Sequence, residues 1–593
     1  MAAVSPHRHF SVLLLMLHFL TASPATQDDL VITTETGKVQ GKIISVLGGE
    51  VRAFLGIPFG KPPVGELRFR APEPAEAWEG VKNATKFGNS CYQIPDTFYS
   101  GFKGAEMWNP NTPLSEDCLY LNVWSPRANK SQSQPSALAP VLVWIYGGGF
   151  TGGTASLDLY DGRFLTQTEN VVVVSMNYRL GAFGFLSLPD NKNVPGNAGL
   201  KDQQLALKWV SKNIAAFGGD PSKVTIFGES AGSGSVGFHV LSPGSQNYFQ
   251  RAIMESGAPN APWSTISNKE SWARAKKLAT SLGCSTNPAE MEACLQKANA
   301  GDIALKQFDV LSQSILAIPF IPVVDGDFLP DKPEVGILLS SSKLPKKDVL
   351  LGLNKDEGTY FLLYGAPGFN ITGQSLITRD QYLQGVALSM ADASNITREM
   401  AIFQYTDWAD KDNTTKNRDF LGSLVGDQLF VCPVLEFAQR YSQHGAKTFI
   451  YFFDHQSSVN PWPEWMGVMH GYEIEFVFGM PLNSSLGYTN SEVNMTKKIM
   501  KHWTNFARTG NLKIDGANWP AFTPDQQHYV TLNTYPPQKK TMLKAHECHL
   551  WTKLLPNLQR ASDDLQACVN ANWIIRCDYK FLLILLVNVF LLY

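Results

Sequence analysis

The sequence of 593 residues has almost no net charge and lacks closely spaced cysteine pairs. Lys and Arg number 50 and Asp and Glu 52, which gives a formal charge of -2. A chain with this balance has no overall basic field that could hold nucleic acid through counterion release. Its eight cysteines contain no CxxC pair, which argues against zinc ribbons and redox motifs. We therefore expect no nucleic-acid partner.

Internal repeats, long linkers, metal-ligand clusters and a dinucleotide fingerprint are also missing, so we expect no metal ion and no cofactor. One short stretch rich in Ser, Gln and Pro, Ser131–Pro140, is typical of a surface loop. At roughly 150 residues per domain the length would allow about four domains. The missing linkers instead favour one compact domain over residues 26–567. A content of 44% hydrophobic and 17% charged residues is that of a globular protein with a large core.

The N-terminal segment differs from the middle of the chain. Arg8 precedes the apolar run Val12–Leu20, and small residues follow at Ser23–Ala25. This is the pattern of a secretory signal peptide, which we assign to residues 1–25. The mature chain is then expected to begin near Thr26.

The C-terminal tail, residues 568–593, ends in the apolar run Phe581–Tyr593, which is interrupted only by Asn588. This run is shorter than the roughly 20 residues of a membrane-spanning helix. A polar spacer, Arg576–Lys580, and small residues around Ala571 precede it, as in a GPI-attachment signal. The alternative is an apolar tail that packs against the protein or forms a dimer contact. We expect an extracellular protein, secreted or anchored to the cell surface through GPI.

Secretion changes the interpretation of the cysteines, because structural disulfides are the default in an oxidising compartment. Their spacing alone does not give the connectivity. The sequence also contains N-x-S/T sequons, which indicate glycosylated surface positions. They are Asn83, Asn129, Asn370, Asn395, Asn413, Asn483 and Asn494.

Uniformly apolar runs predict buried strands, because such runs belong to strands that are covered on both faces, as in parallel sheets. The runs are Pro140–Tyr146, Val171–Met176, Val224–Phe227, Val349–Leu353 and Thr448–Phe453. Helical patterns lie between them, such as Asp202–Phe217 with Gly218 as a stop signal. This alternation predicts an α/β fold: a central, mostly parallel sheet with helices on both faces.

One motif in this scaffold carries chemistry. Val224–Gly232 reads VTIFGESAG, a strand followed by GxSxG and by small residues that can open a helix. In such a nucleophile elbow a tight strand-to-helix turn exposes the serine, here Ser230. The plain alternative is a Gly/Ser-rich turn without chemistry, and the flanking strand and helix patterns disfavour it. Ser230 is the candidate nucleophile.

A serine nucleophile also needs hydrogen-bond donors for the oxyanion that forms when it attacks. Directly after the predicted strand that ends at Tyr146 comes a triple-glycine loop, whose backbone N–H groups can point inward. Gly148 and Gly149, together with the N–H of Ala231, would form an oxyanion hole. The alternative is a flexible surface turn.

The acid and the base are expected to follow the serine in that order. Asp356 and Glu357 both come after the strand at Val349, and the residues alone do not separate them. His455 and His470 follow the last strong strand and are better candidates for the base than the other histidines downstream. The sequence pattern does not choose between these two either.

Four segments resemble the cholinesterase and type-B carboxylesterase family of α/β hydrolases, and the resemblance runs from Asp29 to about Leu558. They are FGESAG, YGGGF, NKDEG and PWPEWMGVMHGYEIEF, with further matches in FLGIPFGKPPVG, EMWNPN, SEDCLYLN and VSMNYRLGAFGF. The resemblance implies an α/β-hydrolase fold and a triad of Ser230, Glu357 and His470. It also implies the oxyanion donors named above.

Within this family, the aromatic residues resemble those of the choline-ester branch. Trp108, in EMWNPN, matches the tryptophan that holds the quaternary ammonium, a group that cannot donate hydrogen bonds and suits a π face. Glu229 can add a negative charge beside the nucleophile, and Tyr360 matches a second choline-facing residue. The resemblance implies further lining residues of the same gorge, Phe361, Tyr364 and Trp462. The plain alternative for each aromatic residue is core packing.

The acyl pocket implied by the resemblance has Trp263 as its wall. Leu316 and Ile318 stand where acetyl-selective enzymes carry phenylalanines, so butyryl-sized groups are expected to fit. At the gorge mouth Asp96 matches an acidic residue of the family. Ile94 and Thr151 replace tyrosines there, which predicts weak binding of bisquaternary ligands.

The resemblance also implies three disulfides, Cys91–Cys118, Cys284–Cys294 and Cys432–Cys548. Cys568 or Cys577 would remain for an interchain bond in a GPI-linked homodimer. We expect a serine esterase that hydrolyses acetylcholine and butyrylcholine. The alternatives are a broad carboxylesterase for neutral esters and a neuroligin-like adhesion protein, and the intact triad argues against the latter.

Overall fold

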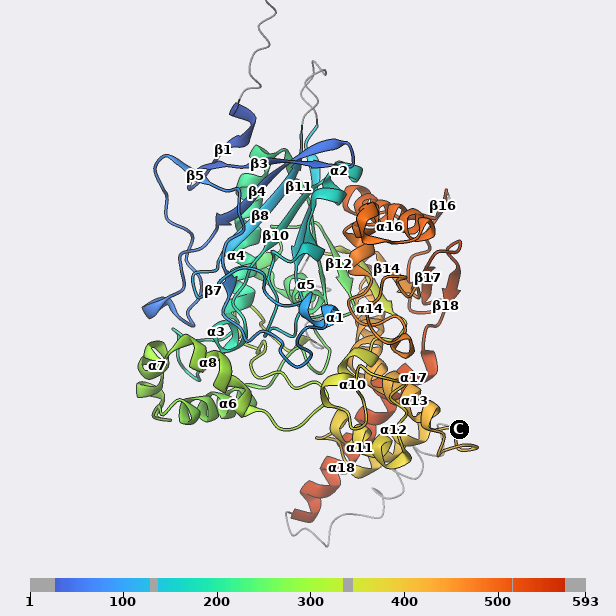
Figure 1. Cartoon of the computed structure of the whole chain (residues 1–593). Coiled ribbons are helices and arrows are strands. Elements are labelled where there is room, and N and C mark those ends of the chain that lie inside the picture. Colours follow the sequence, from blue (N-terminus) through green and yellow to red (C-terminus); the bar gives the residue numbers. More distant parts are fainter. Residues whose placement is uncertain (1–26, 128–136, 334–344, 515, 571–593) are drawn as a thin grey trace, which may run out of the picture.

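The computed structural model describes residues 27–127, 137–333, 345–514 and 516–570, and within them a mixed sheet of eleven strands dominates the fold (Figure 1). In order across the sheet these strands are β18 (Lys539–Thr541), β17 (His528–Leu532), β14 (Thr448–Phe453), β13 (Asp348–Asn354), β12 (Arg251–Glu255), β11 (Gly219–Glu229), β9 (Ala139–Ile145), β10 (Val172–Met176), β8 (Tyr120–Pro126), β4 (Gly49–Pro58) and β3 (Lys42–Val46).

The strands from β17 to β10 run parallel to one another, and antiparallel strands flank them at both edges. Every residue of β9 and β10 is buried, as expected for strands covered on both faces. Because the six parallel pairings point the same way, the carboxyl ends of β11, β13 and β14 meet at one edge of the sheet. The predicted α/β class is confirmed.

Three small sheets lie outside the main one. Their strands are β1 (Val31–Thr34), β2 (Gly37–Gln40) and β5 (Val81–Asn83); β6 (Ser90–Cys91) and β7 (Leu114–Ser115); and β15 (Lys513–Ile514) and β16 (Ala517–Asn518).

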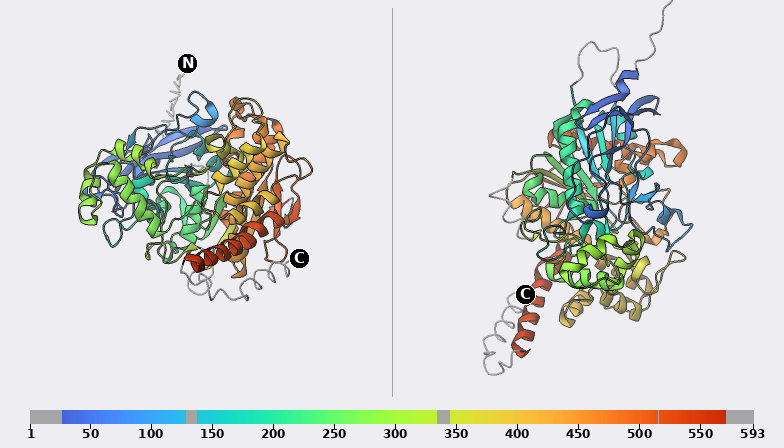
Figure 2. Two further views of the ribbon diagram at one scale, coloured as in Figure 1. Left: turned by 90° about the horizontal axis from the view of Figure 1, so that it is seen from below. Right: turned by 90° about the vertical axis from the view of Figure 1, so that its left-hand side faces the viewer.

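Helices cover both faces of the sheet and form two further groups beyond its carboxyl edge (Figures 1 and 2). The described α-helices are α1 (Lys103–Glu106), α2 (Arg163–Glu169), α3 (Gly181–Phe185), α4 (Ala198–Asn213), α5 (Ala231–Leu241), α6 (Asn268–Ser281), α7 (Pro288–Lys297), α8 (Ala300–Lys306), α10 (Thr359–Gly365), α11 (Arg379–Ser389), α12 (Asn395–Gln404), α13 (Thr414–Gly426), α14 (Cys432–Gln443), α15 (Ile474–Val477), α16 (Asn490–Thr509), α17 (Ala545–His549) and α18 (Leu555–Asn570).

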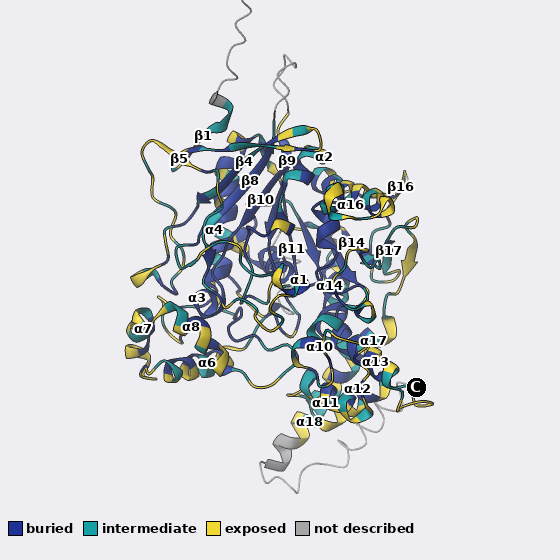
Figure 3. Ribbon diagram, viewed as in Figure 1, coloured by how far each residue is buried: buried dark blue, intermediate teal, exposed yellow. Residues whose placement is uncertain are grey.

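The end of β12 shows which helix covers which face. Successive side chains of a strand point to opposite faces. Met254 packs close to Gly237 of α5, whereas Glu255 accepts a hydrogen bond from Trp503 of α16. The helix after the candidate nucleophile therefore lies on one face and α16 on the other. Figure 3 shows the buried strands between partly exposed outer helices.

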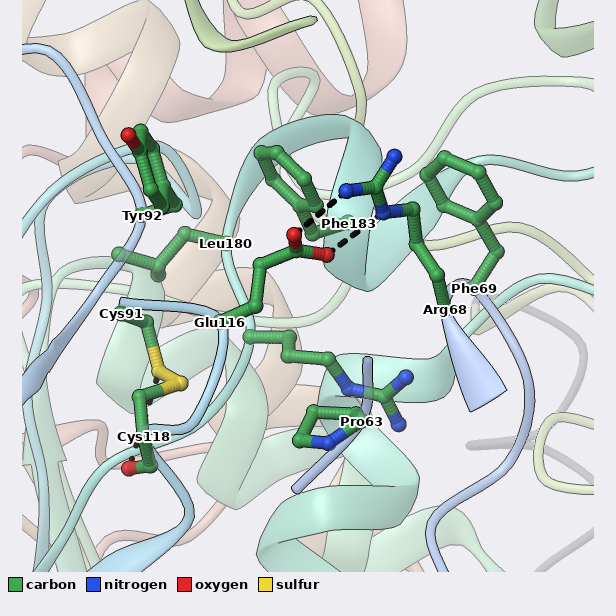
Figure 4. A pocket seen from close by; sticks show the side chains of 10 residues that line it. Pro63, Arg68, Phe69, Cys91, Tyr92, Glu116, Cys118, Leu180 and Phe183 are labelled. Carbon is green, nitrogen blue, oxygen red and sulfur yellow. Dashed lines mark hydrogen bonds and ion pairs between the residues drawn. A yellow bond between two sulfur atoms is a disulfide. The ribbon is translucent and has the colours of Figure 1, made fainter. Parts of the chain in front are cut away.

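The buried Arg68 forms an ion pair with the half-buried Glu116, which precedes β8 (Figure 4), and it also bonds to the chain at the end of α7. The Arg68 guanidinium donates to both carboxylate oxygens of Glu116, at 2.6 and 2.5 Å, and to the carbonyl of Ala298 at 2.6 Å. Removing one partner from such a pair leaves an uncompensated buried charge, which is strongly destabilising. The disulfide Cys91–Cys118 lines the same small pocket.

The structure contains the three disulfides that the family resemblance implied. They are Cys91–Cys118, Cys284–Cys294 and Cys432–Cys548. The side chain of Cys568 and all of Cys577 lie outside the described residues, as do the predicted signal peptide, the apolar tail and the sequon at Asn129. The predictions that concern them stay predictions.

One described helical stretch, Thr414–Gln443, is long and apolar enough to cross a membrane, with a mean hydropathy of 1.4. It comprises α13, a π-helical turn (Asp427–Val431) and α14. Since 78% of its apolar window is buried inside the structure, it is a core element of the fold.

Candidate active site

The candidate nucleophile stands on a strained turn between β11 and α5. Ser230 has φ 57° and ψ −122°, a conformation that non-glycine residues rarely adopt. Its N–H donates to the carbonyl of Glu255 at 2.9 Å, and its own carbonyl accepts from Gly234 at 2.9 Å. A Cβ on Gly147 would lie 2.9 Å from the Ser230 Cβ, so only glycine lets this loop approach the serine so closely.

Glu357 and His470 form a buried pair beside this turn. The Nδ1–H of His470 donates to Oε2 of Glu357 at 2.6 Å. Oε1 of the same carboxylate accepts from the hydroxyl of Ser256 at 2.6 Å and from the N–H of Asn354 at 2.7 Å. Because Nδ1 carries the proton of this bond, Nε2 of the neutral ring is left to accept a proton.

The structure separates the alternatives that the sequence left open. Asp356, the neighbour of Glu357, turns away and accepts the N–H of Val468 at 2.9 Å. His455 lies 3.0 Å from Oε1 of Glu492, at the start of α16. Neither residue reaches the Glu357–His470 pair, so the geometry favours Glu357 as the acid and His470 as the base.

A cavity of about 470 Å³ opens above Ser230 and His470. It brings together most of the residues that the sequence analysis selected. Its lining includes Asp96, Trp108, Gly148, Gly149, Glu229, Ser230, Trp263, Leu316, Ile318, Tyr360, Phe361, Tyr364 and His470.

Three selected residues lie outside this lining. Glu357 is buried behind His470, and Ala231 is the buried first residue of α5. Trp462 stands behind the wall, with its ring 5.5 Å from that of Tyr360 and its N–H directed to the hydroxyl of Tyr472. It supports the lining residue Tyr360 from behind.

Trp108 and Glu229 meet at Gly471, the residue after His470. A Cβ on Gly471 would lie 3.3 Å from the indole ring of Trp108 and 3.5 Å from Oε1 of Glu229. Gly471 has φ 81°, which favours glycine, and the same oxygen of Glu229 is 3.1 Å from Nε2 of His470. The indole ring of Trp108 therefore lies next to Gly471, and the carboxyl group of Glu229 borders the candidate base.

Another part of the lining is apolar. A Cβ on Gly149 would lie 3.4 Å from the Cδ1 of Ile318, so this glycine of the loop faces the aliphatic wall. Sequence reasoning missed Phe430, whose ring is 4.3 Å from His470 and stacks on Phe361 at 5.0 Å. Phe430 lies in the π-helical turn, and its sequence neighbourhood contains no signal for such a position.

At the mouth, the hydroxyl of Tyr364 donates to Asp96 at 2.8 Å and lies 3.3 Å from the hydroxyl of Tyr360. Burial is the main cause that raises the pKa of Tyr360 to about 12 and that of Tyr364 still further, so both remain neutral donors. Ile94 and Thr151 line the same part of the cavity. Asp96 is thus held in place by a tyrosine of the wall.

A model of the carboxylesterase family matches residues 28–551 of the chain. The chain belongs to this family. It is 51% identical to acetylcholinesterase of Bungarus fasciatus over 549 residues, which cover 92% of this chain and 89% of that relative. It is 49% identical to cholinesterase of Mus musculus over 562 residues, covering 94% of this chain and 92% of the relative. This carboxylesterase is a serine carboxylic ester hydrolase.

Buried acids cluster around the candidate triad of this carboxylesterase, and the sequence did not reveal that they lie together. Burial, and then repulsion from Glu357, raises the pKa of Glu473 to about 8. Burial also raises the pKa of Glu229 well above its usual range, followed by repulsion from Glu473, Glu357 and Glu255. Their signal is found only in three dimensions, because they come from four different segments of the chain.

No cluster of three or more His, Cys, Asp or Glu side chains in the described part of the chain is arranged to hold a metal ion. The chemistry available to this carboxylesterase from its described side chains is that of a hydroxyl group, an imidazole and a carboxylate. Such a set performs acyl transfer through a serine.

Proposed function

We propose that this protein hydrolyses choline esters through an acyl intermediate on Ser230. The observation that carries the proposal is the position of Trp108 and Glu229 on either side of Gly471, next to His470. A trimethylammonium group placed there would contact a π face, worth about 0.5–2 kcal/mol depending on desolvation. Its ester carbonyl would then extend toward Ser230. The similarity to proteins named acetylcholinesterase and cholinesterase supports this substrate class.

In the proposed acylation step, Nε2 of His470 takes the proton of the Ser230 hydroxyl as its oxygen attacks the ester carbonyl. Glu357 holds the ring in the required tautomer and stabilises the imidazolium that forms. The imidazolium then protonates the departing choline oxygen. Water hydrolyses the acyl-serine by the same route, again with His470 as base and then acid.

The negative charge on the carbonyl oxygen would be met by the N–H groups of Gly148, Gly149 and Ala231. The two glycines line the cavity beside Ser230, and Ala231 begins the helix whose N-terminus points at the site. Loss of one donor of this type typically costs about 2.7–4 kcal/mol of transition-state stabilisation.

The aliphatic side chains of Leu316 and Ile318, together with Trp263, would leave room for acyl groups larger than acetyl. We infer that butyryl esters are substrates as well. Replacing Leu316 and Ile318 by phenylalanine should lower kcat/KM for butyrylthiocholine while sparing acetylthiocholine. Equal losses for both esters would contradict the assignment of this wall to the acyl group.

The deciding experiment compares kcat/KM for acetylthiocholine and for its uncharged carbon isostere, 3,3-dimethylbutyl thioacetate. We expect the cation to be preferred in the wild type, and Trp108→Ala to reduce that preference by roughly 2- to 30-fold. Trp108→Phe, which keeps an aromatic face, is the matched control and should retain most of it. An equal kcat/KM for the two esters would identify a broad carboxylesterase for neutral esters instead.

We further propose that the enzyme is extracellular, glycosylated and attached through a GPI anchor as a homodimer. None of the six described sequon asparagines is buried, which supports glycan attachment there. A phosphatidylinositol-specific phospholipase should release the esterase from expressing cells. Failure to release it would favour a secreted form. If the dimer is linked through Cys568 or Cys577, a reducing agent should convert it to monomers on a denaturing gel.

A further inference from the structure

Glu229 has a second buried carboxyl group as its direct neighbour in the sheet. In the parallel pairing of β11 with β12, Glu229 is the partner of Glu255, so both side chains start on the same face. Neighbouring strands lie about 4.8 Å apart. Two ionised carboxylates in this relation repel each other strongly when water is excluded.

The same row continues across two more strands. Glu255 pairs with Gly352 of β13, and Gly352 pairs with Tyr451 of β14. A Cβ on Gly352 would lie 1.8 Å from the ring of Tyr451, so this ring crosses over the glycine toward Glu255. The row therefore reads Glu229, Glu255, glycine and tyrosine, on the face that α16 covers.

Glu255 is fully buried, and only one of its two carboxylate oxygens has a hydrogen-bond partner among the described residues. Its Oε1 accepts the indole N–H of Trp503 at 2.7 Å. Its Oε2 has no hydrogen-bond partner among the described residues, and neither has the hydroxyl of Tyr451. Burial and the charge of Glu473 raise the pKa of Glu255 well above its usual range, while the bond from Trp503 opposes this. Glu255 is thus an acid whose charge is costly but not prohibited.

The titratable groups that face this row come from every neighbouring segment. Glu473 and His470 follow β14, and Glu357 follows β13. Tyr160 and Tyr178 also lie near Glu229. Among the described residues, His470 is the basic side chain within ion-pair distance of these acids, at 3.1 Å from Glu229 and 2.6 Å from Glu357. The Glu357 carboxyl group already bonds to His470, and its repulsion is one cause of the raised pKa of Glu229 and of Glu473, so further negative charge here is costly.

We propose that Glu255 is a positioning residue that, together with Glu473, competes with Glu229 for negative charge and thereby raises the pH at which the choline subsite becomes anionic. This inference rests on the proposed function, because the charge of Glu229 matters only for a cationic substrate. Glu255 does not contact the cavity and acts through its strand neighbour.

The test is the pH dependence of the cation preference, the ratio of kcat/KM for acetylthiocholine to that for 3,3-dimethylbutyl thioacetate. Steps that belong to the triad cancel in this ratio, so its midpoint reports ionisation near the ammonium group. Glu255→Gln keeps an acceptor for Trp503 but cannot hold the charge. We expect the midpoint to move to lower pH by roughly 1 unit, because Glu229 then ionises without this competitor.

Glu475→Gln is the matched control. Glu475 is also buried, with a pKa raised by burial to about 7, but its carboxylate accepts from Tyr488 and lies outside the row. The midpoint should not move in this variant. An unchanged midpoint in Glu255→Gln, a shift to higher pH, or an equal shift in the control would overturn the inference.

If the Glu255→Gln protein does not fold and cannot be purified, Tyr451→Phe provides a second test of the inference. The ring of Tyr451 crosses Gly352 toward Glu255, so its hydroxyl is a dipole of the same row, and its loss should disfavour charge on Glu255. We expect a smaller shift in the same direction, and no shift would overturn the inference. A wild-type enzyme without cation preference at any pH would refute the proposed function itself, and the inference with it.

Discussion

The base and the mouth of the cavity differ in how deeply their residues are buried. At the base, Ser230 is fixed by backbone hydrogen bonds on a strained turn, and the buried Glu357 is held by Ser256, Asn354 and His470. At the mouth, Asp96 accepts from Tyr364 and from the N–H of Phe98, but Phe98 is 65% exposed and Ile94 is 42% exposed. We therefore expect substitutions at the base to affect the chemical step and substitutions at the mouth to affect how the substrate arrives.

Ser230→Ala should give the largest effect, a loss of roughly 10⁴- to 10⁶-fold in kcat, because the proposed acyl intermediate forms on this hydroxyl. The melting temperature should stay close to that of the wild type. Ser233→Ala is the control, since Ser233 lies on the same helix with its hydroxyl bonded to the carbonyl of Gly257. Hydrolysis near the wild-type rate in Ser230→Ala would mean that another residue attacks the ester.

Glu357→Gln should lower kcat by roughly 10³- to 10⁴-fold, because an amide cannot stabilise the imidazolium and favours the wrong tautomer. Steady-state kinetics on acetylthiocholine measure the loss. Asp356→Asn tests the adjacent carboxylate, which bonds to Val468 instead of the histidine. If Asp356→Asn proved the more damaging change, the assignment of the acid would be wrong.

Gly471→Ala probes the boundary between base and choline subsite. The added methyl group would press on Trp108 and Glu229, so kcat/KM for acetylthiocholine should fall about 10-fold, and less for the neutral isostere. Gly487→Ala is matched in backbone strain, since both glycines have φ 81°, but nothing lies within 4 Å of its Cβ. Equal losses in both variants would indicate strain rather than crowding.

Asp96→Asn should have a small effect, roughly 2- to 5-fold in kcat/KM at low salt, because a mouth charge mainly steers a cation toward the site. Raising the ionic strength to about 0.15 M should remove most of the difference. A loss that persists at high salt would show that Asp96 acts on the bound substrate.

Ile94→Tyr and Thr151→Tyr should strengthen the binding of bisquaternary ligands at the mouth of the cavity. Each added ring offers a π face to one end of a bisquaternary ligand, so its affinity should rise about 2- to 5-fold per ring. Inhibition constants measure the gain, while kcat for acetylthiocholine should not change. An unaltered inhibition constant would place the ligand's second cation elsewhere.

The sequence predicted those parts of the fold that can be recognised from the residues of a single segment. Uniformly apolar runs located β9, β10, β11, β13 and β14 to within a few residues. The antiparallel strands β4 and β8 were not predicted, because their apolar residues are mixed with polar ones. The GxSxG pattern likewise located the strand-to-helix turn at Ser230, since glycine spacing and flanking patterns are properties of one segment.

The rest of the site depends on contacts between distant segments. Asp356 and Glu357 follow the same strand, and only the packing of the loop before His470 determines which of them meets the imidazole. The family resemblance supplied that choice, and the residues did not. Phe430 and Glu473 were missed for the same reason, because ring stacking and mutual repulsion of acids leave no periodic trace in a sequence.

The proposed triad comes from three distant segments of the chain, which has a consequence for biosynthesis. Glu357 and His470 are 113 residues apart, and Ser230 precedes Glu357 by 127 residues (357 − 230). Domains are synthesised from the N-terminus, and parallel pairing of distant strands is slow. A nascent chain therefore exposes its serine long before a base can activate it, and about four-fifths of the 593 residues must be made first. If this triad is the catalytic one, esterase activity in a sample of the protein counts only those molecules whose β11, β13 and β14 have assembled.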